Sequence, residues 1–539
     1  MEAWDILVIG DGPAALRSAA LSAKSGAKTL LISSTALGKG NSAALDGLAA
    51  SIQEMNNRGH REDTIKSGFF LCDQDIVSAK TSTAIDEMNH LEKAGVVFSR
   101  DAKGLPMTKK LIGHSSPRVV DAGDASIRDV QQILEEQCMK HGVVRRGDQL
   151  PVMLVSTKQK VDGIITLDMV NGRFLAIQTK AVIIADGGFE GVFNGTGIGY
   201  GMDLALRAGL PLRDMEFIAK TPLAVADSKL VLSSAMLGYG ADLCDTSGAN
   251  LSAENMADLC DVAAQSGGAV MDGRNMGDSG VWWQSAFRIV KSSTGVDMNK
   301  YTVGLENRVN QTIGGIPTDE CGRAVIGSWS RWFTGLYAAG DAACSGLNGA
   351  GTLPGNRLLD ALTGGSSAAT HAAEWVAKQS FSNTDNLRES LENCEANFAT
   401  KFSAEASETV HRVGALNSRL LGIATKFTSN ANSADDLSKM LEDLAQAATS
   451  AQEIHLDQKS LIANTNYSSL LRVQSGIRLL RASIKSALAR NESRGVHLRS
   501  DFAEENPELI HHITVDNEDN VGTLAVRKGQ KDNWILAPQ

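Results

Sequence analysis

The sequence predicts an α/β fold organised around a parallel sheet, and three observations support this prediction. Residues 5–9 are rich in Ile, Leu and Val and run into a glycine-rich turn at 10–15, which an Ala-rich helical pattern follows. A second apolar strand covers residues 28–32, and a third covers 181–184. Strand, glycine turn and helix in this order form the start of a dinucleotide-binding unit.

The first turn has the pattern Gly-x-Gly-x-x-Ala. Gly10 permits a sharp turn, Gly12 lets main-chain amides approach a pyrophosphate, and Ala15 lets the helix pack closely on the strand. The anion would lie at the helix N-terminus, whose first turn contains Pro13 and Ala14. The pattern alone is also compatible with a plain loop, so the strand and helix on either side are what favour the dinucleotide interpretation.

The end of the second strand bears on which dinucleotide is bound. A nicotinamide-binding fold usually has an Asp or Glu there for the ribose, whereas this chain has Ser33 and Ser34. We therefore expect FAD rather than NAD, because hydroxyl groups can also hold a ribose. The two serines could equally begin an ordinary loop.

A Gly- and Ser-rich loop follows the second strand at residues 37–48. Its main-chain amides could wrap the ribityl chain of a flavin, which makes Gly40, Asn41, Ser42 and Gly47 candidate cofactor ligands. A surface linker is the alternative interpretation.

The composition limits the class of protein. A chain of 539 residues is long enough for two to four domains, and its net charge of -10 argues against a nucleic-acid surface. Seven scattered cysteines without a CxxC pair, and ten histidines without ligand spacing, predict neither a disulfide framework nor a metal site. The sequence predicts no leader segment, and it contains no apolar run near the ~18 residues that a membrane span needs. We therefore expect a cytoplasmic chain that does not itself span a membrane.

The order of elements extends the prediction. Residues 60–145 are mostly helical, and from residue 151 short strands alternate, with turns expected at 162–163 and 171–172. This meander returns to the strand at 181–184, which ends in Ala185 and Gly187. A meander that returns to a central strand beside the dinucleotide is typical of flavoproteins with two dinucleotide-binding folds.

At this point the chain resembles the flavoprotein subunit family of succinate dehydrogenase, fumarate reductase and L-aspartate oxidase, to which adenylylsulfate reductase is related. The matching segments, in order, are 10–15, 185–188, 205–209 with 214–217, 314–318, 335–341, 355–360 and 492–497. The resemblance implies an FAD-binding Rossmann-like domain with an inserted α+β capping domain and a C-terminal helical domain. The expected boundaries are 1–225 and 310–380 for the FAD-binding domain, 226–309 for the capping domain, 381–499 for the helical domain and 500–539 for a terminal subdomain.

The resemblance also implies further cofactor contacts. Gly340 and Asp341 would lie at the far end of the flavin, with the carboxylate near the ribityl hydroxyls. A helix starting at Asn356 would direct its N-terminus at the electron-rich side of the flavin ring, where aligned amides stabilise negative charge. Its first turn contains Arg357, Leu358 and Leu359.

Several family positions are substituted in this chain. The histidine that binds FAD covalently in some members corresponds to Asn41, so we expect non-covalent FAD. The histidine of a His-Pro-Thr stretch in the dicarboxylate enzymes corresponds to Thr221. A substrate histidine corresponds to Asn310, and an arginine corresponds to Thr352. The proton-delivering arginine of the capping domain falls near Ser279. Since Ser and Thr cannot replace a cationic clamp and acid at neutral pH, other residues have taken over these roles or the substrate differs.

The cations that remain in these segments are Lys220, Arg274 and Arg357. Together with Thr221 they are the candidate catalytic residues, and burial could lower the pKa of Lys220 into a useful range. Each cation could instead be a solvated or ion-paired side chain.

The resemblance implies an FAD-dependent oxidoreductase subunit that acts on a small molecule and passes electrons to an iron-sulfur partner. A membrane anchor among its partner subunits could hold the complex at the cytoplasmic membrane. Two alternatives stay open. The chain could act on another substrate, as L-aspartate oxidase or adenylylsulfate reductase does, or it could be a non-catalytic flavin-binding subunit.

Overall fold

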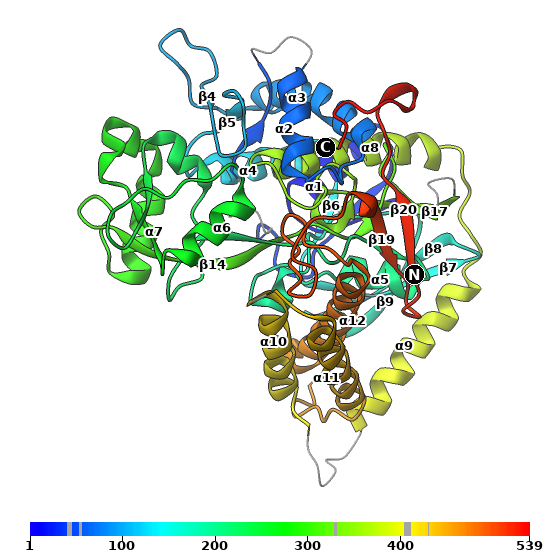
Figure 1. Cartoon of the computed structure of the whole chain (residues 1–539). Helices are drawn as coiled ribbons and strands as arrows, with labels where there is room; N and C mark the ends of the chain where they lie inside the picture. Colours follow the sequence, from blue (N-terminus) through cyan, green and yellow to red (C-terminus); the bar gives the residue numbers. More distant parts are fainter. Residues whose placement is uncertain are drawn as a thin grey trace.

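The computed structural model describes residues 1–39, 46–52, 57–327, 331–403, 411–429, 431–460 and 462–538 (Figure 1). Its largest sheet has the strand order β16-β17-β8-β9-β1-β2-β6, with β7 beside β8. The strands of this sheet are β1 (Glu2–Ile9), β2 (Thr29–Ile32), β6 (Val144–Arg146), β7 (Gln149–Thr157), β8 (Lys160–Asp168), β9 (Arg173–Ile184), β16 (Arg323–Ile326) and β17 (Arg331–Ala338).

The predicted parallel centre of this sheet is confirmed. β1 lies between β2 and β9 and runs parallel to both, and β17 runs parallel to β9. Side chains alternate across β1, so Ile6 and Val8 join one buried cluster while Leu7 and Ile9 join the other. The first cluster is covered by the helices α1 (Pro13–Lys24), α3 (Gln74–Ala94), α4 (Ser126–Lys140) and α8 (Asn356–Val376).

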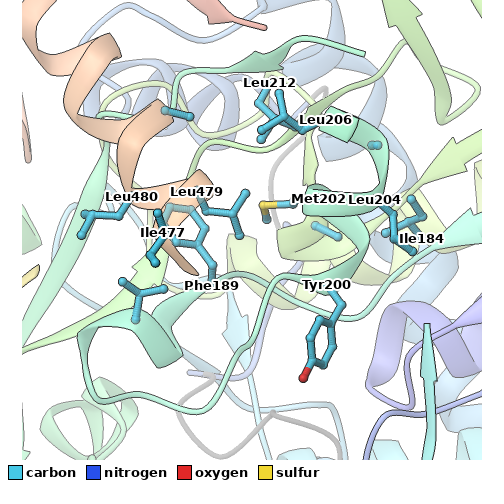
Figure 2. Packing of buried hydrophobic residues seen from close by; sticks show 14 of the residues in the cluster. Ile184, Phe189, Tyr200, Met202, Leu204, Leu206, Leu212, Ile477, Leu479 and Leu480 are labelled. Carbon is cyan, nitrogen blue, oxygen red and sulfur yellow. The ribbon is translucent and has the colours of Figure 1, made fainter. Parts of the chain in front are cut away.

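The second cluster joins the sheet to the C-terminal helices. Figure 2 shows Ile184 of β9 near Leu204 and Met202 of α5 (Tyr200–Arg207), with Leu479 of α12 (Thr465–Ala489) on the other side. All of these side chains are at most 2% exposed. Burial of this much apolar surface fixes the helical region against the sheet.

The meander β7-β8-β9 is present, but one of its predicted turns is wrong. Asp162 and Gly163 lie inside β8, and the chain instead reverses at Lys158 and Gln159, which both have positive φ. Two left-handed residues suit a tight hairpin turn, and neither is a glycine that would mark it in the sequence. The second turn, which contains Gly172, lies where it was expected.

A separate sheet has the strand order β11-β14-β13-β12. Its strands are β11 (Ile218–Val225), β12 (Asp242–Asp245), β13 (Ala269–Asp272) and β14 (Val303–Thr312), and α6 (Met256–Gln265) and α7 (Gln284–Thr294) accompany them. Figure 1 shows this capping unit in green, to one side of the large sheet. The sheet thus includes β11 and the end of β14, on both sides of the expected limits 226–309.

The remaining helices form two groups. α9 (Asp385–Ser403) packs against the meander, whereas α10 (Val413–Ser429), α11 (Ala434–Gln452) and α12 form a bundle. The chain then returns, as β19 (His511–Val515) and β20 (Val521–Ala525) pair in an antiparallel hairpin that adds to β10 (Leu212–Arg213).

Short elements complete the region next to the cavity described below. They are α2 (Arg58–Ser67), the three-stranded sheet of β3 (Leu48–Ala49), β5 (Val119–Val120) and β4 (Thr108–Lys109), the pair β15 (Ile316–Pro317) and β18 (Ala343–Cys344), and the 3-10 helices η2 (Glu190–Phe193), η3 (Ser234–Tyr239) and η5 (Gly340–Ala342).

Candidate functional site

The N-terminus of α1 is open to an anion. No side chain caps the helix, and the main-chain N–H groups of Gly12, Ala14 and Ala15 have no acceptor among the described residues. A Cβ added at Gly12 would meet no atom within 4 Å. The turn therefore presents main-chain donors to open space, as a pyrophosphate-binding turn does.

Close backbone approaches bring this turn to the other predicted segments. Gly10 has φ +124°, and a Cβ there would lie 2.2 Å from the Ala185 carbonyl oxygen. Gly340 has φ +63°, and its added Cβ would lie 2.9 Å from Cβ of Ala14. The first turn, the end of β9 and η5 are thus neighbours, although 330 positions separate Gly10 from Gly340.

The other predicted cofactor positions vary in their surroundings. Ser33 is buried at the end of β2, and Gly187 has φ +84° with open space at its Cβ position. Gly47 also has positive φ and packs against the Val120 carbonyl. Gly40, Asn41 and Ser42 lie outside the described residues.

The start of α8 supplies a second set of donors. The N–H groups of Arg357 and Leu358 have no acceptor among the described residues, whereas that of Leu359 donates to the Gly355 carbonyl at 3.4 Å. The side chain of Asn356 is fully buried, with Oδ1 2.8 Å from Nε2 of His60. Asn356 therefore holds α8 against α2, and the helix N-terminus itself is what could face a flavin.

Arg357 lies in a buried ion cluster. Its Nε donates to Oδ2 of Asp341 at 2.7 Å, and one terminal nitrogen lies 3.3 Å from Oε1 of Glu190. The other oxygen of Asp341 accepts from Gln311 at 3.1 Å. Burial, with the Asp341 charge adding to it, raises the pKa of Glu190 to about 7. The charge of Arg357 is thus largely compensated inside the protein.

A cavity of about 70 Å³ lies between the capping unit and the start of α8. One water needs roughly 10–15 Å³ on this scale, so a small organic molecule can be accommodated. Its polar or charged lining residues are Asp46, Ser67, Lys220, Thr221, Ser234, Asn255, Asn310, Gln311, Thr352 and Arg357.

The structure brings Lys220, Thr221 and Arg357 together at this cavity, with the substituted family positions Asn310 and Thr352. A register shift in the pairing of β11 with β14 occurs between Ala219 and Lys220, and such irregularities re-aim side chains. No ion pair or hydrogen bond links the Lys220 ammonium to another described side chain. Burial lowers its pKa.

Arg274 does not join this group. Its side chain is 51% exposed and pairs with Asp272 at 2.6 Å, and neither it nor Ser279 lines the cavity. In the capping unit, the start of α6 occupies this place instead, with Asn255, Met256 and Ala257 lining the cavity. The Asn255 side chain caps the helix by accepting from the Asp258 N–H at 3.0 Å.

Sequence reasoning missed Asp46, Glu190, Ser234 and the start of α6. Asp46 belongs to the loop after β2, and its Oδ1 accepts from the Ser234 N–H at 2.7 Å. An Asn followed three residues later by Asp, before an apolar pattern, was a readable helix start at Asn255. Asp46 and Glu190 had no local signal, because their partners lie more than 100 positions away.

Comparisons with known proteins agree with this geometry. The profile of a family described as "FAD binding domain" matches residues 5–358, and that of "Fumarate reductase flavoprotein C-term" matches 421–534. The succinate dehydrogenase flavoprotein subunit of Rickettsia conorii is 26% identical over 97% of this chain and 94% of its own length. L-aspartate oxidase of Agrobacterium fabrum is 29% identical over 97% of both.

The fold has a close counterpart among solved structures. A mutant FrdA chain of Escherichia coli quinol fumarate reductase superposes with a TM-score of 0.90, at 22% identity, over 100% of this chain and 99% of that one. This likeness concerns the fold alone, and it covers the large sheet, the capping unit and the helical bundle together.

The uncapped helix N-termini and the glycine contacts fit a dinucleotide, and the profile match makes the class plain: the chain is an FAD-binding flavoprotein. Within that class it belongs to the family of the succinate dehydrogenase and fumarate reductase flavoprotein subunits, which also contains L-aspartate oxidase.

Two findings bear on the partners expected from the sequence. Among the described helices, none combines the length and apolar character that a membrane crossing needs. All seven cysteines are free thiols, and the described ranges contain no cluster of His, Cys, Asp or Glu able to hold a metal ion.

Proposed function

We propose that this chain is the catalytic flavoprotein subunit of an oxidoreductase that exchanges two electrons between a small carboxylic acid and FAD. The observation that carries this proposal is that Lys220, Thr221, Arg357 and the start of α6 line the same cavity. The relatives named for succinate, fumarate and aspartate support a carboxylic acid as the substrate class.

Different residues at this cavity would bind the substrate, carry a proton and orient the substrate. FAD, when bound, supplies hydride transfer. Asn255 caps only the Asp258 N–H of α6, and the N–H groups of Met256 and Ala257 have no acceptor among the described residues. Lys220 and these two N–H groups would bind the carboxylate, because an ammonium and a helix N-terminus both attract anions. The lowered pKa of Lys220 also allows it to carry a proton, while Thr221 would orient the substrate by hydrogen bonding.

Cofactor binding would use both halves of the FAD-binding domain. The donors of Gly12, Ala14 and Ala15 would hold the pyrophosphate, and those of Arg357 and Leu358 would face the flavin ring. We propose non-covalent binding because Asn41 cannot form the bond that a histidine forms. Acid precipitation should then release all of the flavin, and yellow colour retained in the pellet would contradict this.

Anaerobic spectroscopy tests the redox proposal. The oxidised protein should lose its visible flavin absorption when the correct acid is added, or the reduced protein should regain it with the corresponding unsaturated acid. The panel should include succinate, fumarate, L-aspartate and acids with one carboxylate. A protein that binds FAD but responds to no small molecule would favour the non-catalytic alternative.

The electron acceptor is proposed from the relatives, whose flavoprotein subunits belong to complexes. We propose an iron-sulfur protein as the partner, and partner subunits as the source of any attachment to the cytoplasmic membrane. The tagged chain, isolated from the cells that produce it, should co-purify with iron and acid-labile sulfide. Isolation of catalytically competent protein without iron and without acid-labile sulfide would contradict the proposal of an iron-sulfur partner.

A further inference from the structure

The charged groups at the cavity are few. Among the described residues that line it, three have charged side chains, namely Asp46, Lys220 and Arg357. Arg357 is held by Asp341 and Glu190 at 2.6 Å and 3.3 Å. Lys220 is therefore the one cation of the described lining whose charge no carboxylate pairs with directly.

A carboxylate lines the same cavity. Among the described residues, Oδ1 of Asp46 accepts hydrogen bonds from the Ser234 N–H at 2.7 Å and from the Ser233 hydroxyl at 3.1 Å. Asp46 thus brings a carboxyl group to the lining. Burial raises its pKa, and hydrogen bonds from Ser234 and Ser233 oppose that rise. A second carboxylate on a bound molecule would lie near this group without a second cation to offset its charge, because Arg357 is already paired with Asp341 and Glu190.

The remaining polar lining is neutral. Ser234 is 2% exposed, and the buried Thr352 hydroxyl has no hydrogen-bond partner among the described residues. Thr221 and Asn310 complete this neutral set. Hydroxyl and amide groups can satisfy an uncharged carbonyl, hydroxyl or amide of a ligand, but they do not neutralise a carboxylate.

We propose that the cavity selects a small acid with a single carboxylate and excludes dicarboxylates. This inference rests on the proposed function. The carboxylate binds at Lys220 and the N-terminus of α6, and the rest of the molecule is uncharged or positively charged where it faces Asp46, Ser234 and Thr352. The chain would therefore differ in substrate class from relatives named for succinate and fumarate.

Matched acids test the selection directly. Butyrate has the carbon skeleton of succinate with one carboxylate fewer, and crotonate is related to fumarate in the same way. Each acid is titrated into the oxidised, FAD-loaded protein, and the shift of the visible flavin spectrum gives its Kd, whether or not it reacts. We expect the monocarboxylate of each pair to bind at least about tenfold more tightly than the dicarboxylate, since uncompensated like charges oppose binding.

Variants locate the effect. Asp46→Asn keeps the Oδ1 acceptor and removes the ionisable carboxyl group. It should therefore narrow the difference in Kd between the monocarboxylate and the dicarboxylate of each pair. Asp278 is an exposed residue of the capping unit, and Asp278→Asn should leave this difference in Kd unchanged. Dicarboxylates that bind as tightly as their partners in the wild-type protein, or no spectral shift with any of the four acids, would overturn the proposal.

The outcomes also separate this inference from the proposed function. Flavin reduction by succinate would support the redox function and overturn the selection for one carboxylate. Tight butyrate binding in a protein whose FAD no acid reduces would support the selection and overturn the redox function.

Discussion

Nε of Arg357 donates a hydrogen bond to Oδ2 of Asp341, at 2.7 Å. Arg357 belongs to the first turn of α8 and Asp341 to η5, so this contact ties the helix N-terminus to the segment that meets the first glycine turn. Glu190 contacts the same guanidinium at 3.3 Å. An arginine that sequence reasoning proposed as catalytic is thus also the centre of a structural ion cluster.

Removal of Arg357 should destabilise the protein. The substitution Arg357→Gln leaves Glu190 and Asp341 without their shared cation, and breaking a buried ion pair from one side typically costs about 3–5 kcal/mol. Chemical denaturation followed by circular dichroism, with saturating FAD throughout, measures the change in the free energy of unfolding.

Two companion variants make this prediction specific. Arg274→Gln removes an exposed ion pair and should have little effect. The double variant Arg357→Gln with Glu190→Gln should recover part of the lost stability. If Arg357→Gln were as stable as the wild type, the cluster would not be the structural unit described above.

Gly12 should be needed for the cofactor but not for the fold. Its φ of -82° suits any residue, and an added Cβ meets no protein atom within 4 Å. In Gly12→Ala a methyl group would occupy the space of the pyrophosphate, and forced overpacking costs about 1–3 kcal/mol. The Kd for FAD, measured by fluorescence titration of the apoprotein, should rise about tenfold or more.

A glycine remote from the cofactor provides the control. Gly422 lies in α10, and its Cβ position is also empty. Gly422→Ala should leave FAD affinity unchanged and stabilise the helix by about 0.5–1 kcal/mol. Equal FAD affinity in Gly12→Ala and Gly422→Ala would place the pyrophosphate elsewhere.

The raised pKa of Glu190 predicts a pH dependence of stability. Burial, together with the Asp341 charge, raises this pKa from 4.5 to about 7 in the folded state. Between these values the folded state binds more protons than the unfolded state, so stability falls as pH rises from about 4.5 to 7. The contribution is on the order of 3 kcal/mol.

Glu190→Gln should remove this component. The free energy of unfolding of Glu190→Gln minus that of the wild type should rise from about pH 4.5 to pH 7 and stay constant above about pH 7. If the free energies of unfolding of the two proteins changed with pH in parallel, the pKa of Glu190 would not be raised in the folded protein, and this prediction would be wrong.

The sequence was most informative where function requires a local pattern. The turn from Gly10 to Ala15 and the helix that follows could be predicted because backbone geometry restricts these positions to small residues. The resemblance also pointed to positions 221, 310 and 352, which line one cavity. The turn at Lys158 and Gln159 was missed because tertiary context, and not a glycine, holds both residues at positive φ.

Long-range contacts could not be predicted. Asp46 accepts a hydrogen bond from Ser234, and Glu190 accepts one from Arg357. More than 160 positions separate the two residues of each pair. The capping unit shows the same limitation. The sequence predicts Arg274 and Lys220 as candidates of the same kind, but the fold places Arg274 at the surface and Lys220 at the cavity.

The most direct test of the central claim compares flavin reduction in the wild type and in Lys220→Met, under anaerobic conditions, with whichever acid of the panel reduces the wild-type FAD. We predict that Lys220→Met retains FAD and loses reduction by the acid, while the exposed control Lys300→Met behaves as the wild type. An unchanged rate and half-saturating acid concentration in Lys220→Met would contradict the account, because the cavity would then not be where the substrate binds.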